Sequence, residues 1–179
     1  MTIRDKAYLA GFLDADGSII IQLRHRSSFK YRFRVKITTV FYQDSRYHHL
    51  LKDFKTSIQA GYLYYRNDRM SKLRIEGFKQ NKKLLSSLHP YARFKKPQIE
   101  IVLKAISILE KKYSLSEFLE VCKLSDEVSR LNYSSKRRIY TSQFVIQELK
   151  KLKIIPVTTG SPAMMGEKIE ILAKKLANL

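Results

Sequence analysis

The fold of this chain is decided by the stretch Tyr8-Leu9-Ala10-Gly11-Phe12-Leu13-Asp14-Ala15-Asp16-Gly17. Apolar and small residues recur at helical spacing from about residue 3 to residue 13, and the run closes in an acidic turn that ends on glycine. This pattern predicts a helix with a glycine stop. Gly11 and Ala15 are small and four residues apart, so they share one helix face and allow another backbone to approach closely. The Asp16 carboxylate then lies beside that contact.

The segments that follow this helix predict an α+β fold. Residues 18–41 are rich in Ile, Val, Phe, Tyr and Thr, with polar Ser27-Ser28 near their middle. They predict two long strands joined by a turn. Next we expect a helix at about 50–58, a strand pair at 61–66 and 72–78, and a short helix that ends near 88–90. The order is therefore helix, strand, strand, helix, strand, strand, helix.

Beyond this αββαββα pattern the sequence predicts further helices, at about 98–112, 114–132 and 141–153. Ser114 and Glu117 have the spacing of a capping box, which supports a helix start there. A length of 179 residues favours about one domain. We expect a single domain over residues 1–155, with 156–179 as a linker and a short C-terminal helix of the same domain.

The composition indicates a polyanionic partner. The chain has 35 Lys and Arg against 16 Asp and Glu, a formal net charge of +19, which is more than solubility requires. Nucleic acid is favoured over a membrane, because no apolar run is long enough to span a bilayer and the basic residues are not gathered on one amphipathic helix.

Cys122, the single cysteine, lies in an apolar helical segment, so it is interpreted as a core residue rather than a reactive thiol. No intrachain disulfide can form, and nothing indicates an oxidising compartment. The N-terminus passes directly into the first periodic segment, which leaves no room for a signal or transit peptide. We expect a protein that is not secreted and works where it is made, in an organelle or a prokaryotic cytoplasm.

The two long strands carry a one-sided pattern of basic residues, because side chains alternate between the faces of a strand. No acidic residue occurs between Asp16 and Asp44, and a solvated face normally mixes charges of both signs. A twisted antiparallel ribbon fits the DNA major groove. The side chains predicted to contact DNA are Gln22, Arg24, Arg26 and Ser28 from the first strand, Lys30, Arg32, Arg34, Lys36 and Thr38 from the second, and Tyr64, Arg66, Lys72 and Arg74 from the second strand pair. The alternative is a solvated outer face.

The stretch that opened this section resembles the signature motif of the LAGLIDADG homing endonucleases, and the resemblance covers roughly residues 7–153. Because the chain has one copy of the motif, it resembles the single-motif, homodimeric branch, which cuts both strands of a long, pseudo-palindromic DNA site. The two motif helices then meet across a two-fold axis. The predicted interface residues are Leu9, Gly11, Phe12 and Ala15.

Two such helices would bring two Asp16 carboxylates together. At about 4 Å they repel by roughly 4 kcal/mol at an effective dielectric of 20, unless divalent cations lie between them. Oxygen ligands and a phosphodiester substrate favour Mg²⁺, and Mn²⁺ is expected to substitute. Metals placed this way can activate water and stabilise the leaving oxygen. The resemblance adds a backbone carbonyl, here that of Ala15, as a second ligand, whereas Asp14 is expected to cap or brace the helix end.

The resemblance also implies catalytic residues outside the motif. Gln43 takes the place of a polar residue after the second strand that organises solvent around the metals. Lys95 best matches a lysine near the scissile phosphate that favours hydroxide or stabilises transition-state charge; Lys96 is the alternative, and either lysine could simply bind phosphate. Tyr47 stands where close family members often have an arginine, so the solvent network differs or Arg46 substitutes.

Two further sequence features are a histidine pair and a basic stretch. His48-His49 is not expected to bind metal, because adjacent histidines on a helix point in different directions and have no ligand partner at a suitable spacing. A basic stretch between two helices is predicted to grip the DNA backbone, as the corresponding loop does in the family, rather than to be an idle solvated loop. Its DNA-binding residues are Lys136, Arg137 and Arg138.

The hypothesis that follows is a site-specific homing endonuclease, encoded within an intron and initiating its spread. Two alternatives remain open at this point: an intron RNA maturase, with intron RNA as the partner, and a catalytically silent DNA-binding regulator of the same fold. The presence of Asp16, Gln43 and Lys95 together argues against the silent regulator, because a protein that only binds DNA needs no carboxylate facing a phosphodiester.

Overall fold

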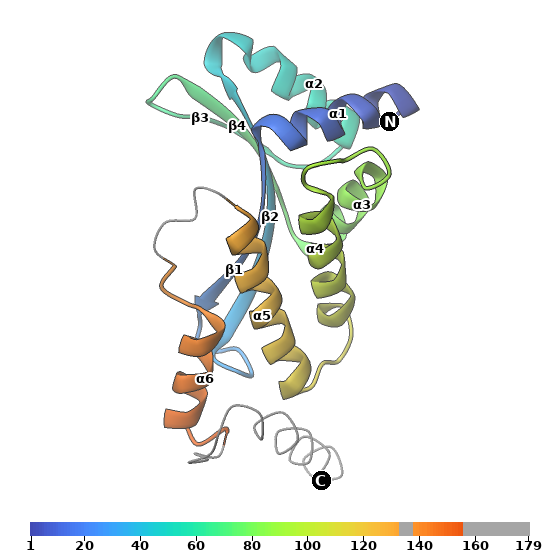
Figure 1. Cartoon of the computed structure of the whole chain (residues 1–179). Coiled ribbons are helices and arrows are strands. Elements are labelled where there is room, and N and C mark those ends of the chain that lie inside the picture. The colour runs from blue at the N-terminus through green and yellow to red at the C-terminus, as the bar shows by residue number, and fades with distance from the viewer. Residues whose placement is uncertain (133–137, 156–179) are drawn as a thin grey trace.

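The computed structural model describes residues 1–132 and 138–155. It has the predicted α+β order, with further helices after the αββαββα core (Figure 1). The elements are α1 (Ile3–Asp16), β1 (Gly17–His25), β2 (Phe33–Asp44), the 3-10 turn η1 (Ser45–Tyr47), α2 (His48–Ile58), β3 (Tyr62–Tyr65), β4 (Met70–Glu76), α3 (Phe78–Leu88), α4 (Lys96–Leu109), α5 (Leu115–Leu131) and α6 (Ser142–Lys151).

One antiparallel sheet with the strand order β1-β2-β4-β3 forms the centre of the molecule. Its apolar face is covered by helices, with α5 running along β1 and α4 beside α5 (Figure 1). Successive side chains of β2 alternate between the two faces: Phe33, Val35 and Ile37 are buried, whereas Arg34 between them is exposed and Lys36 is half-buried. One hydrophobic cluster extends from Leu9 in α1 to Ile155 after α6. The predicted linker and helix at 156–179 lie outside the described residues.

Gly17, which ends the motif, has a different backbone conformation from the predicted one. Gly17 has φ −96, which is extended backbone rather than the left-handed conformation of a glycine cap. A Cβ at this position would lie 2.5 Å from Leu13 Cδ1 and 2.7 Å from the Leu13 carbonyl oxygen. Glycine is therefore needed because β1 starts directly against the last turn of α1.

The connection between the two long strands is wider than predicted. It covers residues 26–32 rather than a turn at Ser27-Ser28, and Arg32 closes it with φ 60. The Tyr31 ring turns inward and packs 5.0 Å, between centroids, from Phe118. Tyr31 is 7% exposed, and the strand pairing ends at His25 and Phe33. The predicted DNA-contacting residues that consequently lie in this loop and not on a strand face are Arg26, Ser28, Lys30 and Arg32.

The predicted capping box and the predicted core position of the cysteine agree with the structure. Ser114 and Glu117 form the capping box at the start of α5, with the Ser114 amide donating to Glu117 Oε2 at 2.7 Å. Cys122 is buried in the core, and burial raises the pKa of its thiol to about 12. Within residues 1–132 and 138–155, the helices are all too short or too polar to cross a membrane.

Asn81 of α3 is a buried polar residue that fixes the sheet to the helix layer. Its Oδ1 accepts from Thr39 Oγ1 at 2.7 Å, and its Nδ2 donates to the carbonyl of Gly77 at 2.7 Å. The carbonyls of Ile37 and Ile75 lie 3.3 and 3.2 Å from the same nitrogen. One side chain thus satisfies groups of β2, β4 and the turn before α3.

We predict that Asn81→Ala lowers the free energy of unfolding by about 3 kcal/mol, because it leaves buried polar groups without partners. Urea titration followed by circular dichroism measures the change. Gln80→Ala, at an exposed position of the same helix, is the control and should change stability by less than about 0.5 kcal/mol. Equal effects of the two substitutions would contradict the assigned role of Asn81.

Candidate active site at the end of the motif helix

The Asp16 carboxylate is the last side chain of α1 and is exposed. Among the residues that the structure describes, it has no hydrogen-bond or ion-pair partner. The carbonyl of Ala15 is one of the last four of the helix, which have no partner within the helix. Two oxygen ligands of the kind that Mg²⁺ prefers therefore lie next to one another at the helix end.

Asp14 faces the opposite way and joins α1 to the segment before α4. Its Oδ2 accepts from the backbone amide of Arg93 at 2.7 Å, and its Oδ1 accepts from the amide of Lys95 at 2.8 Å. The structure thus confirms that Asp14 braces the helix end. Both carboxylate oxygens are occupied in this way, which leaves Asp16 as the open carboxylate of the motif.

The side chain of Lys95 lies at the same helix end. Its Nζ donates to the Asp14 carbonyl at 2.6 Å. Burial lowers the pKa of the Lys95 ammonium, whereas the nearby carboxylates of Asp14 and Asp16 act in the opposite direction. Lys96 is exposed and begins α4. The geometry therefore favours Lys95 over Lys96 as the lysine of the site.

Gln43 lies near the end of β2, at the same end of the sheet. Gly17, directly after the motif aspartate, pairs with Phe41, so Gln43 is two residues beyond that pair. Its Oε1 accepts from the amide of Asp44 at 2.8 Å. Arg46 is held by the Asp44 carboxylate at 3.0 and 3.1 Å. Tyr47 is half exposed beside it, and the Arg46 guanidinium lies 6.0 Å from its ring.

The motif helix also presents an open face of small residues. Ala7, Gly11 and Ala15 are exposed, and a Cβ built at Gly11 would have nothing within 4 Å. This face forms one side of a hollow of about 630 Å³, and the other side is the segment 90–94. Phe94, in that segment, is 82% exposed. Such a face can accept another helix backbone.

Two of the predicted interface residues do not belong to this face. Leu9 is 1% exposed and lies in the core of its own chain. Phe12 is half-buried and packs edge-on against Phe54, with 5.0 Å between ring centroids. Their side chains point from α1 toward the rest of the chain, which leaves Gly11 and Ala15 as the interface candidates, together with Ala7.

The predicted DNA-contacting side chains on the sheet differ in how freely they can reach a ligand. Gln22, Arg24 and Arg34 are exposed, and so are Tyr64 and Arg66 of the second strand pair. Lys36, Lys72 and Arg74 are half-buried, whereas Thr38 is only 5% exposed. Thr38 is therefore covered by its neighbours in this structure and is dropped as a DNA contact. The four predicted contacts that lie in the loop of residues 26–32 are exposed; they are Arg26, Ser28, Lys30 and Arg32.

An acidic residue missed by the sequence analysis lies on the polar face of the sheet. Glu76, at the end of β4, forms ion pairs with Lys36 and Arg74. The sequence between Asp16 and Asp44 has no acidic residue, so Lys36 was expected to have no acidic partner. Its partner, Glu76, comes instead from a strand more than thirty residues later. The register that pairs Thr38 with Glu76 could not be read from composition.

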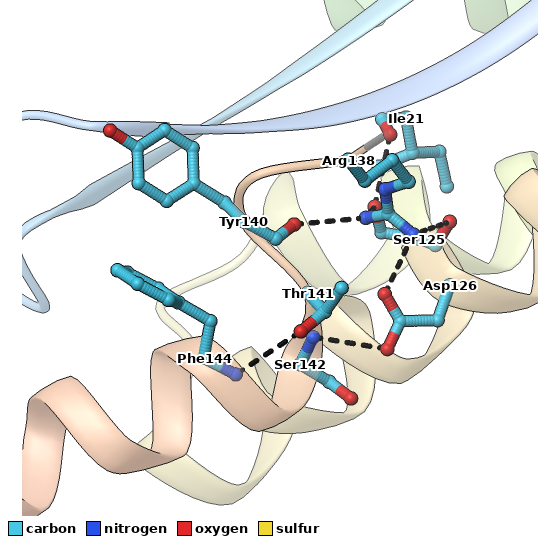
Figure 2. A network of polar contacts seen from close by, with 8 residues as sticks. All are labelled: Ile21, Ser125, Asp126, Arg138, Tyr140, Thr141, Ser142 and Phe144. Atoms are coloured by element: carbon cyan, nitrogen blue, oxygen red, sulfur yellow. Dashed lines mark hydrogen bonds and ion pairs between the residues drawn. The ribbon is translucent and has the colours of Figure 1, made fainter. Parts of the chain in front are cut away.

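Arg138 has a structural role that the sequence did not predict (Figure 2). Its Nη1 donates to Asp126 Oδ1 at 2.7 Å and to the Ser125 carbonyl at 3.1 Å, and its Nη2 donates to Ser125 Oγ at 2.7 Å and to the Tyr140 carbonyl at 3.2 Å. Ser125 Oγ in turn donates to the Ile21 carbonyl on β1. The guanidinium is thus committed to the protein, and Arg138 is removed from the predicted DNA contacts. Lys136 and Arg137 lie outside the described residues.

The two histidines after β2 have different surroundings. The ring of His48 is buried, stacks at 3.9 Å on Tyr65 and lies with Nδ1 3.1 Å from Ser71 Oγ. His49 is exposed. Across residues 1–132 and 138–155, no group of three or more His, Cys, Asp or Glu side chains could hold a metal ion.

Comparison with known proteins places the chain in a family. The family model described as LAGLIDADG endonuclease matches residues 9–106, and the chain belongs to the LAGLIDADG endonuclease family. It is 33% identical over 146 residues to the DNA endonuclease I-CvuI of Chlorella vulgaris, covering 82% of this chain and 90% of that protein. It is 35% identical over 146 residues to the DNA endonuclease I-CreI of Chlamydomonas reinhardtii, covering 81% and 88%.

Solved structures agree with this assignment. The homing endonuclease I-CvuI, in complex with the I-CreI target in the presence of Mg, superposes with a TM-score of 0.79 and 31% identity, covering 86% of this chain and 99% of that one. The archaeal intron-encoded homing endonuclease I-Vdi141I, complexed with DNA, has a TM-score of 0.75 at 17% identity, covering 85% and 98%. The second likeness supports the fold alone.

The two aspartates at the end of the motif should respond differently to the same substitution. We predict that Asp14→Asn lowers the free energy of unfolding by about 2 kcal/mol, because an amide cannot accept from both backbone amides. Asp16→Asn should leave stability within about 0.5 kcal/mol of the original. Urea unfolding of both variants measures the difference, and a loss confined to Asp16→Asn would contradict the described arrangement.

Proposed function

We propose that the chain is a Mg²⁺-dependent, site-specific DNA endonuclease that acts as a homodimer on a long pseudo-palindromic site and initiates intron homing. The observation that carries the proposal is the open Asp16 carboxylate at the end of a helix whose outer face is made of small residues. The basic face of the sheet supports DNA as the substrate, and so do relatives that are DNA endonucleases. Their names and complexes concern DNA, so we propose no RNA partner.

The residues at the helix end fit a divalent cation. Asp16 supplies an exposed carboxylate that has no partner within residues 1–132 and 138–155, and Ala15 supplies one of the last four carbonyls of the helix. Mg²⁺ prefers oxygen ligands in near-octahedral geometry and keeps several waters. When bound, it would supply activation of water and stabilisation of negative charge on phosphate oxygens. One chain offers too few ligands for this, so we propose that a second chain supplies the same pair.

The chain's own residues have separate tasks in this proposal. Lys95 Nζ, held at the Asp14 carbonyl, places a positive charge beside the scissile phosphate and stabilises the charge that develops in the transition state. Burial lowers the pKa of Lys95, which makes its ammonium a better proton donor toward a leaving oxygen. Gln43 orients solvent from the end of β2. Asp14 keeps Lys95 in place through the backbone.

We propose that two chains meet at the open faces of their α1 helices, at Ala7, Gly11 and Ala15. Without a side chain at Gly11 the helix backbones can approach closely, and Phe94 at the edge of the hollow offers apolar surface to the same partner. The two Asp16 carboxylates then come together at the seam. Dimerisation is therefore a condition for a complete active site.

Asp16→Asn should abolish cleavage, because the amide carries no charge for the metal, while DNA binding stays within about threefold of the original, since the basic sheet is unaffected. Cleavage is measured on duplexes that carry the target, and binding by gel shift with the same duplexes. Glu120→Asn is the control on α5 and should cleave normally. Cleavage that persists in Asp16→Asn would sink the proposed mechanism.

Gly11→Leu should fold as a monomer and lose cleavage. A side chain at this position meets nothing within 4 Å of its Cβ in one chain, but it fills the space that a second helix needs. Lys83→Leu, exposed on α3, is the matched control and should remain dimeric. Light scattering after gel filtration gives the mass. An active Gly11→Leu monomer is the result that contradicts the dimeric site.

A further inference from the structure

Glu76 lies on the polar face of the sheet, on which the cations predicted to contact DNA also lie. It pairs with Thr38 of β2 across the ladder, and Thr38 pairs in turn with Ile20 of β1. Glu76 is therefore level with the middle of the two long strands, at the end of β4, whose outer neighbour β3 pairs with it only as far as Arg74. Its side chain is 28% exposed.

Two cations from different strands contact the same oxygen of Glu76. Lys36 Nζ on β2 is 2.8 Å from Oε1, and Arg74 Nη2 on β4 is 2.6 Å from Oε1. The hydrogen bond from Lys36 lowers the pKa of the Glu76 carboxyl, burial opposes it, and Arg74 and Arg24 contribute in the same direction as Lys36. The group is therefore ionised at neutral pH.

The two cations are held in place more firmly than surface side chains are. The side chains of Lys36 and Arg74 are 22% and 27% exposed, and Arg74 also lies over the Tyr64 ring at 5.9 Å. Within the part of the chain that the structure describes, Arg74 Nε is buried without a hydrogen-bond partner, and the guanidinium contacts Glu76 and the Tyr64 ring. Partly buried, charge-assisted contacts of this kind restrict side-chain freedom more than exposed pairs do.

A carboxylate in this place is unfavourable if the face only binds phosphates. Glu76 repels phosphate oxygens and occupies two cations that would otherwise contact them. In the major groove, however, base amino groups are donors, and a glutamate accepts from the N4 amino group of cytosine. A fixed carboxylate between two fixed cations offers a defined acceptor and donor pattern to base edges.

We propose that Glu76 is a specificity-determining residue of the DNA-binding face, which holds Lys36 and Arg74 in fixed positions and selects a base pair that presents a cytosine amino group to it. The proposal rests on the proposed function, because it requires the face to bind duplex DNA. Glu76 lowers affinity for any DNA sequence and increases the difference between the correct sequence and the others.

The test compares base preference at every position of the selected site. The original protein, Glu76→Gln and Glu120→Gln select sites from a pool of random duplexes in EDTA, so that DNA is bound without being cut. For Glu76→Gln we expect about tenfold weaker preference at one base pair of each half-site. Binding to random duplex should strengthen, with a salt slope steeper by about 0.9 for each released cation that reaches a phosphate.

Glu120→Gln is a matched control, because Glu120 is also paired with a lysine, Lys104, but lies on α5. It removes the same charge and should leave base preference unchanged. A role of Glu76 in stability alone predicts weaker binding to all sequences, which would overturn the proposal. Thermal unfolding checks that Glu76→Gln is folded; if it is not, Lys36→Gln, which removes one of the two partners, should change preference at the same base pair.

The outcomes also separate this inference from the proposed function. If the original protein selects no sequence, the proposed function fails and the inference fails with it. If it selects a site and Glu76→Gln selects the same site with the same preference at every position, only the role of Glu76 is overturned.

Discussion

The carboxylate of Asp14 connects two distant parts of the chain, and the candidate site depends on that connection. It accepts from the backbone amides of Arg93 and Lys95, which are 79 and 81 residues away in sequence. These contacts fix the end of α1 relative to the segment that carries the lysine. Asp14 is used structurally, which leaves Asp16 as the open carboxylate of the motif among the described residues, and Lys95 Nζ lies at the same helix end.

On the sheet, general attraction to polyanions is combined with cations whose positions are set by ion pairs. A net charge of +19 provides attraction to any polyanion, and attraction alone does not distinguish sequences. On the polar face, Glu76 pairs with Lys36 and Arg74. Arg138, on the connection between α5 and α6, is also held by a carboxylate, that of Asp126. In both places the cationic side chains are paired with a carboxylate of the same chain. The exposed cations outside these pairs are the ones proposed to contact phosphates.

The sequence predicted those features that depend on local periodicity. The motif helix, the alternation of the long strands and the Ser114 cap were readable because each is set by neighbouring residues. The position of Glu76 was not readable, because it depends on the register between β2 and β4. The inward direction of Phe12 depends on packing against Phe54, which lies on another helix.

The candidate site was predictable to a similar extent. The motif itself singled out Asp16, and the resemblance added Gln43 and Lys95, but spacing alone did not decide between Lys95 and Lys96. That choice depends on the contact of Lys95 with Asp14. The structural use of Arg138 was missed for the same physical reason: a long cationic side chain can reach acceptors on other elements that no local pattern reveals.

The central claim is that one chain holds half of an active site. The most direct measurement is the specific cleavage activity over a series of dilutions, with the monomer fraction determined at each concentration by analytical ultracentrifugation. The account predicts that activity per chain falls in proportion to the dimer fraction. Activity per chain that stays constant down to concentrations at which the protein is monomeric would contradict it.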